Sequence, residues 1–137
     1  MVTFIDEVYR LGYVATPAKK DGYVVPFISI DDMVFLKRAW VAHPLAGAQV
    51  LALAPKSIWK AFGWHSTDSK VSPREKIVQV ARGAQIEAWL HGPDFFRQFQ
   101  DDLCQMFSEI DYPPPELLSS DELLARWKTN ELRSWAM

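Results

Sequence analysis

The chain has little cysteine and no long apolar run, and both facts narrow its class. Cys104 is the one cysteine among 137 residues, which excludes an intrachain disulfide and a cysteine-rich zinc site. No apolar run approaches the roughly 20 residues that a membrane-spanning helix needs. The acidic start MVTFIDEVYR is also unlike a signal peptide. We therefore expect no membrane span and no targeting segment, and a reducing intracellular compartment fits.

The motifs of several enzyme classes are missing as well. No Gly-x-Ser-x-Gly elbow presents a nucleophile, and no glycine-rich loop could cradle a phosphate. His43, His65 and His91 follow no metal-ligand spacing, so we expect core or surface roles for them. The formal net charge of −2 gives no overall attraction to nucleic acid or anionic membranes. Any anion site must therefore be local.

The pair Asp31-Asp32, in the stretch DDMVFLKRAW, is the first candidate for chemistry. Adjacent carboxylates can bind Mg²⁺ because hard oxygens suit that ion. Such sites usually recruit a further carboxylate from another strand, and no nearby acid suggests itself. Two aspartates before a strand more often form a turn. We interpret the pair as a turn and assign no metal ligand in the chain.

Strand patterns come first in this sequence and helical patterns follow. Residues 3–11 predict a short helix ended by Gly12, with an apolar stripe that nothing upstream covers. Residues 13–55 contain four segments typical of strands, separated by turn residues: YVAT, GYVVPFISI, MVFLKRAWVA and AQVLALA. From residue 56 onward the pattern is helical. This order favours an α+β fold.

Start and stop signals divide the helical part. After a short helix near Ile58–Phe62, Ser72 and Glu75 predict a capping box at the start of a helix that runs to about His91. Gly92-Pro93 ends that helix and begins the next, and YPPPE predicts a rigid extended connector. Ser119 and Glu122 predict a second capping box. The inward stripe of the middle helix is Phe95, Phe96, Phe99, Leu103, Met106, Phe107 and Ile110.

Two pairs of basic residues could form a local anion site. Lys19 and Lys20, in TPAKKDG, lie in a predicted turn directly after a strand. Lys37 and Arg38 lie in a β segment after Phe35, and neighbouring strand residues face opposite sides, so one of the two should share the face of Phe35. Strand-borne cations can position a phosphate backbone rigidly. A solvated strand face explains them at least as well.

The stretch GYVATPAKKDG followed by DDMVFLKRAW resembles the C-terminal part of picornavirus-like RNA-dependent RNA polymerases. In that family Thr-Pro-Ala-Asp-Lys belongs to palm motif D, Phe-Leu-Lys-Arg is carried by the hairpin of motif E, the primer grip, and a helical thumb follows. Thr16–Lys20 and Phe35–Arg38 match these motifs in the same order, and the likeness covers essentially the whole chain. Lys19 replaces the family's Asp, so either Lys19 or Lys20 is the functional lysine, and the spacing favours Lys20.

The resemblance implies that residues 1–55 are the C-terminal edge of the palm and residues 56–137 the thumb. It implies template-directed nucleotidyl transfer in viral RNA replication, with Mg²⁺, NTPs and an RNA template-primer, in a replication complex in the host-cell cytoplasm. Lys20 would be the general acid that protonates the leaving pyrophosphate. The implied primer contacts are Phe35, Leu36, Lys37 and Arg38. Candidates for phosphate contact on the long helix, where exposed charges are more often only solubilising, are Arg74, Lys76 and Arg82.

The family's Gly-Asp-Asp metal motif precedes motif D, so we expect it, with the fingers, before Met1. The chain would then be a fragment truncated at its N-terminus, dependent on the remainder of the polymerase and inactive alone. A different class is a small non-enzymatic α+β interaction module that uses the aromatic helix Phe95–Phe107 as a partner surface, although core packing explains that stripe better. An in-frame Gly-Asp-Asp upstream in the coding sequence would favour the polymerase.

Overall fold

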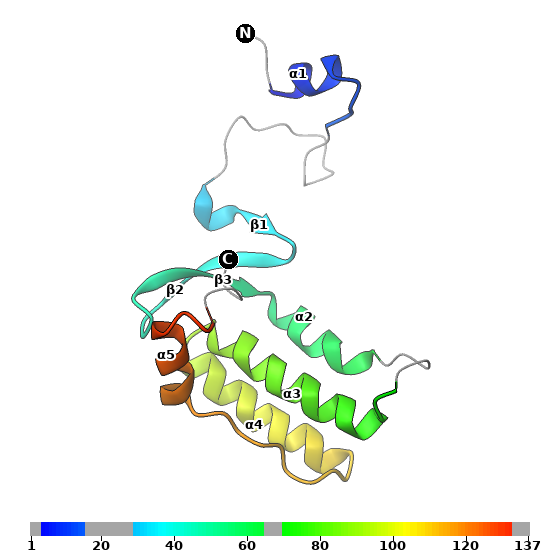
Figure 1. The fold of residues 1–137 in the computed structure, drawn as a ribbon, viewed down its shortest axis with the longest axis vertical. Coiled ribbons are helices and arrows are strands. Elements are labelled where there is room, and N and C mark those ends of the chain that lie inside the picture. Colours follow the sequence, from blue (N-terminus) through cyan, green and yellow to red (C-terminus); the bar gives the residue numbers. More distant parts are fainter. Residues whose placement is uncertain (1–3, 16–28, 65–69, 133–137) are drawn as a thin grey trace.

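The computed structural model of the chain describes residues 4–15, 29–64 and 70–132 (Figure 1). Within these ranges one short helix is followed by a three-stranded antiparallel sheet in the order β1-β2-β3 and then by a helical layer. This arrangement confirms the predicted α+β class. The elements are α1 Phe4–Arg10, the 3-10 turn η1 Ile30–Asp32, β1 Val34–Phe35, β2 Arg38–His43, β3 Ala48–Leu53, α2 Pro55–Lys60, the 3-10 turn η2 Ala61–Gly63, α3 Pro73–Trp89, α4 Pro93–Glu109 and α5 Ser120–Lys128.

Strands β2 and β3 form the longest hairpin of the sheet. Val41 pairs with Val50, and the strands are joined by a turn in which Gly47 has a φ of 62° and donates its N–H to the His43 carbonyl at 3.0 Å. Val50 and Ala52 alternate toward the core and are fully buried. The prediction of a strand in AQVLALA is confirmed. MVFLKRAWVA, in contrast, is not one strand but two, β1 and β2.

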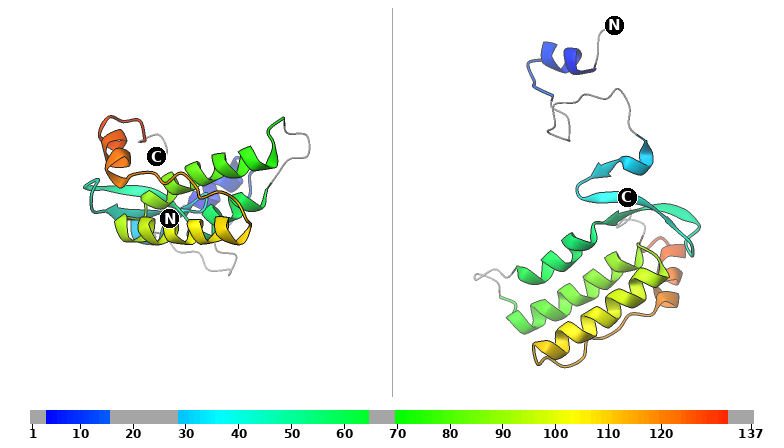
Figure 2. Two further views of the ribbon diagram at one scale, coloured as in Figure 1. Left: turned by 90° about the horizontal axis from the view of Figure 1, so that it is seen from below. Right: turned by 180° about the vertical axis from the view of Figure 1, so that it is seen from behind.

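Helices α2, α3 and α4 lie side by side beneath the sheet, and α5 packs at the end of this layer (Figures 1 and 2). Aromatic rings connect them, with the Trp59 and Phe99 centroids 4.6 Å apart. The stripe predicted for α4 is buried at Phe96, Phe99, Leu103 and Phe107, while Ile110 is exposed. Because this stripe is the core of the domain, the helix Phe95–Phe107 does not offer it as a partner surface.

One predicted helix cap is confirmed and one is wrong. The Ser72 Oγ accepts the Glu75 N–H at 3.2 Å and the Glu75 carboxylate accepts the Ser72 N–H at 3.2 Å, which completes the capping box of α3. Ser119 precedes α5 but its side chain makes no capping hydrogen bond. The Glu122 carboxylate, the other half of the predicted box, accepts a hydrogen bond from Arg126 at 2.9 Å.

The extended connector between α4 and α5 is held by a buried amide. The Gln85 Nε2 donates to the Glu116 carbonyl at 2.9 Å, and its Oε1 accepts the Leu118 N–H at 2.9 Å. The Gln100 Nε2 adds bonds to Gln85 Oε1 and to the Leu118 carbonyl. A proline-rich segment has few backbone donors of its own, so this side-chain network fixes its path across α3 and α4.

The N-terminal part differs most from the expected strands. Helix α1 forms as predicted and ends at Arg10, followed by a turn in which Gly12 has a φ of 85°. It buries none of its residues and lies apart from the other elements (Figure 1). The strand predicted in YVAT is wrong for Tyr13–Ala15, which pair with no strand among the described residues, and Val14 is 81% exposed. Residues 16–28, with Lys19, Lys20 and most of GYVVPFISI, lie outside the described residues.

Candidate nucleic-acid interface

Residues Val34–Arg38, which we call the hairpin tip, contain the strand ends and the turn that join β1 to β2. Phe35 pairs with Arg38, so Leu36 and Lys37 are the two turn residues. Both have left-handed backbones, with φ values of 51° and 62°. Two positive φ values in a two-residue turn are the signature of a type I′ hairpin, in which Asn-Gly is the preferred sequence. Here non-glycine residues hold that geometry at a cost of about 1–2 kcal/mol each.

The hairpin tip presents apolar side chains and one cation to solvent. Val34, Phe35 and Leu36 are 65%, 64% and 75% exposed, and Lys37 is exposed as well. The interpretation of Lys37 as a residue within a strand is therefore wrong, because it lies in the turn. Arg38 shares the sheet face of Phe35, since directly opposed residues of an antiparallel pair point to the same side.

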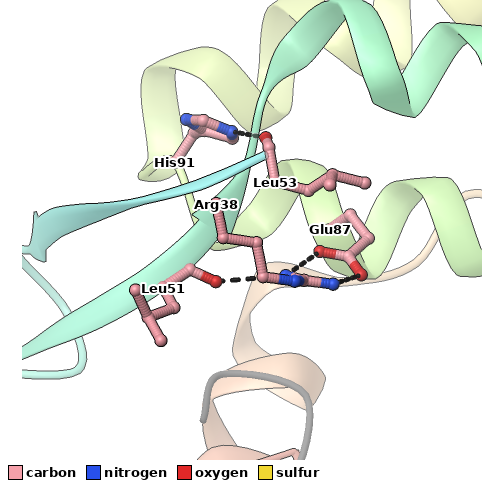
Figure 3. Close-up of polar contacts among 5 residues, drawn as sticks. All are labelled: Arg38, Leu51, Leu53, Glu87 and His91. Carbon is pink, nitrogen blue, oxygen red and sulfur yellow. Dashed lines mark hydrogen bonds and ion pairs between the residues drawn. The ribbon is translucent and has the colours of Figure 1, made fainter. Parts of the chain in front are cut away.

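Arg38 makes a forked contact with helix α3 (Figure 3). Its Nη1 donates to Glu87 Oε2 at 2.9 Å and its Nη2 donates to Glu87 Oε1 at 2.6 Å. The same Nη1 donates to the Leu51 carbonyl at 3.1 Å. The Arg38 side chain is 23% exposed and that of Glu87 10%. The guanidinium is thus paired with a carboxylate and joins β2 to both β3 and α3.

Two histidines connect the sheet to the C-terminal end of α3. The His91 Nε2 donates to the Leu53 carbonyl at 2.6 Å (Figure 3), and the His43 Nε2 lies 2.7 Å from the Trp89 carbonyl. Because the His43 Nδ1 accepts the Ala46 N–H at 3.1 Å, the neutral ring carries its proton on Nε2 and donates to Trp89. Burial lowers the pKa of His43, and the bond to Trp89 opposes that shift only in part. His43 is buried in the core and His91 is half-buried, so both fall within the expected core or surface roles, and His65 lies outside the described residues.

The other predicted basic candidates do not form one row. The Arg74 guanidinium lies 5.6 Å from the centroid of the Tyr112 ring. Lys76 lines an apolar pocket together with Trp64, and Arg82 is exposed. At about 100° per residue, Arg74 and Arg82 lie about 80° apart around α3, while Lys76 leaves the helix on another side. Their role in contacting phosphates stays a prediction.

The acidic pair has the predicted conformation. Asp31 and Asp32 end the 3-10 turn η1 before β1, and both are exposed. Their interpretation as a turn is confirmed. In the part of the chain that the structure describes, no group of three or more His, Cys, Asp or Glu side chains could hold a metal ion. The described residues therefore do not fit a Mg²⁺ site.

Sequence reasoning missed Glu87, the partner of Arg38. The one available signal is local, because Glu87 is a carboxylate inside the otherwise apolar run Ile86–Leu90, whose members are all buried. A buried carboxylate requires a partner. The sequence gives no reason to choose Arg38 over any other cation.

Comparison with known proteins gives relatives among viral polyproteins. The replication polyprotein of Nora virus is 34% identical over 104 residues, or 75% of this chain. The genome polyprotein of human hepatitis A virus genotype IIIA is 30% identical over 96 residues, or 69% of this chain. The chain spans about 4% of the length of each. No protein-family model and no solved structure matches the chain significantly.

These homologues are picornavirus-like, as the motif resemblance predicted, and they are consistent with a polymerase fragment. They connect the chain to viral replication at the level of the polyprotein. Within the described ranges, no helix has the length and apolar character required to cross a bilayer.

Proposed function

We propose that this chain is the C-terminal part of an RNA-directed RNA polymerase of a picornavirus-like virus. Residues 1–55 would form the palm edge and residues 56–137 the thumb, acting with the remainder of the polymerase in a replication complex in the host cytoplasm. The observation that carries the proposal is the hairpin tip, where Phe-Leu-Lys-Arg forms an exposed two-residue turn in a chain similar to a viral replication polyprotein.

In this proposal the hairpin tip is the primer grip. The Lys37 ammonium would contact a phosphate of the primer, and the exposed side chains of Phe35 and Leu36 would pack against its sugars. Lys20 would donate a proton to the leaving pyrophosphate, since a lysine brings both a proton and a positive charge to that group. The Mg²⁺ of the reaction would be held by residues outside this chain, with NTPs and an RNA template-primer as substrates.

The proposal is tested by the salt dependence of RNA binding. The chain is titrated into a fluorescent RNA duplex with a recessed 3′ end, and the logarithm of the binding constant is plotted against that of the salt concentration. We expect Lys37→Ala to make the slope shallower by about 0.7–0.9, the value for one phosphate contact. Lys128→Ala, which removes an exposed lysine from the last turn of α5, is the matched control and should keep the wild-type slope.

Two results would contradict the proposal. One is a wild-type chain that shows no salt-dependent affinity for the duplex. The other is a Lys37→Ala slope equal to that of the wild type, which would mean that the exposed turn lysine does not contact the backbone.

A further inference from the structure

The hairpin tip is attached to the helical layer through the residue that follows its turn. Arg38 is the first residue of β2, and its guanidinium makes two bonds to Glu87 on α3 and one to the Leu51 carbonyl on β3. The turn is also bonded directly to the residue after β3, because the Ala54 N–H donates to the Lys37 carbonyl at 2.8 Å. The orientation of Lys37 therefore depends on contacts to β3 and α3.

We propose that Arg38 is a positioning residue, whose ion pair with Glu87 holds the hairpin tip on α3 and so presents Lys37 to RNA in a fixed place. This inference rests on the proposed function. It differs from the simpler expectation that Lys37 and Arg38 both contact the primer. In this inference Lys37 contacts phosphate, and Arg38 fixes where Lys37 lies.

Electrostatics supports this division. The Glu87 carboxylate neutralises the guanidinium charge and would repel a phosphate brought to the same place. Nη1 already donates twice, to Glu87 and to Leu51, so its hydrogens are occupied. Lys37 has a solvent-exposed side chain one residue away. Of the two cations, Lys37 is the one whose charge is available to a nucleic acid.

The geometry also explains why an arginine is required. A planar guanidinium donates two parallel hydrogen bonds to one carboxylate, which fixes an angle as well as a distance. A lysine ammonium is a point charge on a flexible stem and would leave the orientation free. The turn contains two strained left-handed residues. Loss of the Arg38–Glu87 contact should therefore let the turn relax to a less strained conformation.

Glu87→Gln separates the positioning role from a direct contact by the sign of its effect. If Arg38 contacted phosphate, removal of the adjacent carboxylate would strengthen RNA binding. If Arg38 positions the turn, binding should weaken by about threefold to tenfold, because the competent orientation becomes a minor population. Glu122→Gln is the matched control, since it removes the same charge from the exposed Glu122–Arg126 pair.

Arg38→Lys is the second variant. It preserves the charge and loses the fork, so a positioning role predicts the same weakening as in Glu87→Gln, and a direct contact predicts near-normal binding. Tighter binding by Glu87→Gln, or wild-type affinity of Arg38→Lys, would overturn the inference.

A measurement without RNA keeps the inference separate from the proposed function. Hydrogen exchange of the Ala54 amide, which donates to Lys37, should speed up in Glu87→Gln by about fivefold or more relative to that of Leu103 in the core of α4. Faster Ala54 exchange in a chain that does not bind RNA would support the positioning contact and reject the polymerase role. Exchange at Ala54 that only follows Leu103 would reject the positioning contact, whatever the RNA result.

Discussion

The strained turn of the hairpin tip makes a prediction whose size follows from the structure. Leu36 and Lys37 have φ values of 51° and 62°, and an L-residue in this region costs about 1–2 kcal/mol. Replacing the pair by Asn-Gly, the favoured type I′ sequence, removes most of that cost. Since Leu36 is three-quarters exposed, its loss costs only about 0.5 kcal/mol of burial. The new glycine costs about 0.5–1 kcal/mol of backbone entropy. The hairpin should gain about 1–2 kcal/mol in all.

The assay is hydrogen exchange of the amides in the β1–β2 ladder, which reports local opening directly. A gain of this size should slow their exchange about 5- to 30-fold, while RNA binding weakens because Lys37 is gone. Gly47→Ala is the converse control: Gly47 also has a φ of 62° and no atom within 4 Å of an added Cβ, so the variant should lose about 1–2 kcal/mol through its backbone alone. Faster exchange in the Asn-Gly variant would refute the strain argument.

Three further predictions concern stability and activity. Because burial lowers the pKa of His43 from its ordinary value of 6.5, the unfolded chain binds more protons as the pH falls through that value. The free energy of unfolding in urea should therefore decrease as the pH is lowered through 6.5, and His43→Gln should remove this dependence. Gln85→Leu leaves the Leu118 N–H and the Glu116 carbonyl without their partner and should cost about 2–3 kcal/mol in urea unfolding, against under about 0.5 kcal/mol for Gln98→Leu on the exposed face of α4. The purified 137-residue chain, whose sequence has no Gly-Asp-Asp, should incorporate no nucleotide into a primed RNA, and extension above background would contradict this.

The helical part of the fold could be predicted because its signals are local. The capping box at Ser72, the Gly92-Pro93 break and the spacing of the α4 stripe each depend on residues within a few positions of one another. Ser119 and Glu122 have the same local signal, yet Ser119 makes no capping side-chain bond and Glu122 pairs with Arg126. A capping motif predicts where a helix begins more reliably than it predicts the bonds made there.

The hairpin tip could not be predicted from residue patterns for a physical reason. A two-residue hairpin turn is normally recognised in a sequence by Asn or Gly. Because Leu36-Lys37 contains neither, MVFLKRAWVA has the pattern of one continuous strand. Only the resemblance to motif E indicated a hairpin there. The pairing of Glu87 with Arg38 could not be predicted for another reason. The two residues are 49 positions apart, and a single sequence contains no signal for a contact at that separation.

The role of Lys20 carries the catalytic part of the proposal, and one measurement tests it most directly. It is primer extension by the complete polymerase region, in which this chain is expressed together with the upstream segment that the proposal expects to carry Gly-Asp-Asp. We expect Lys20→Ala to slow the catalytic step by about 10²–10⁴-fold, the usual loss for a general acid, with little change in nucleotide binding and with loss of the alkaline ionisation from the pH–rate profile. Lys19→Ala removes a neighbouring charge of the same sign and should turn over nearly normally. A slower Lys19→Ala enzyme would move the role by one residue, and normal turnover by both variants would contradict the assignment of this segment as motif D.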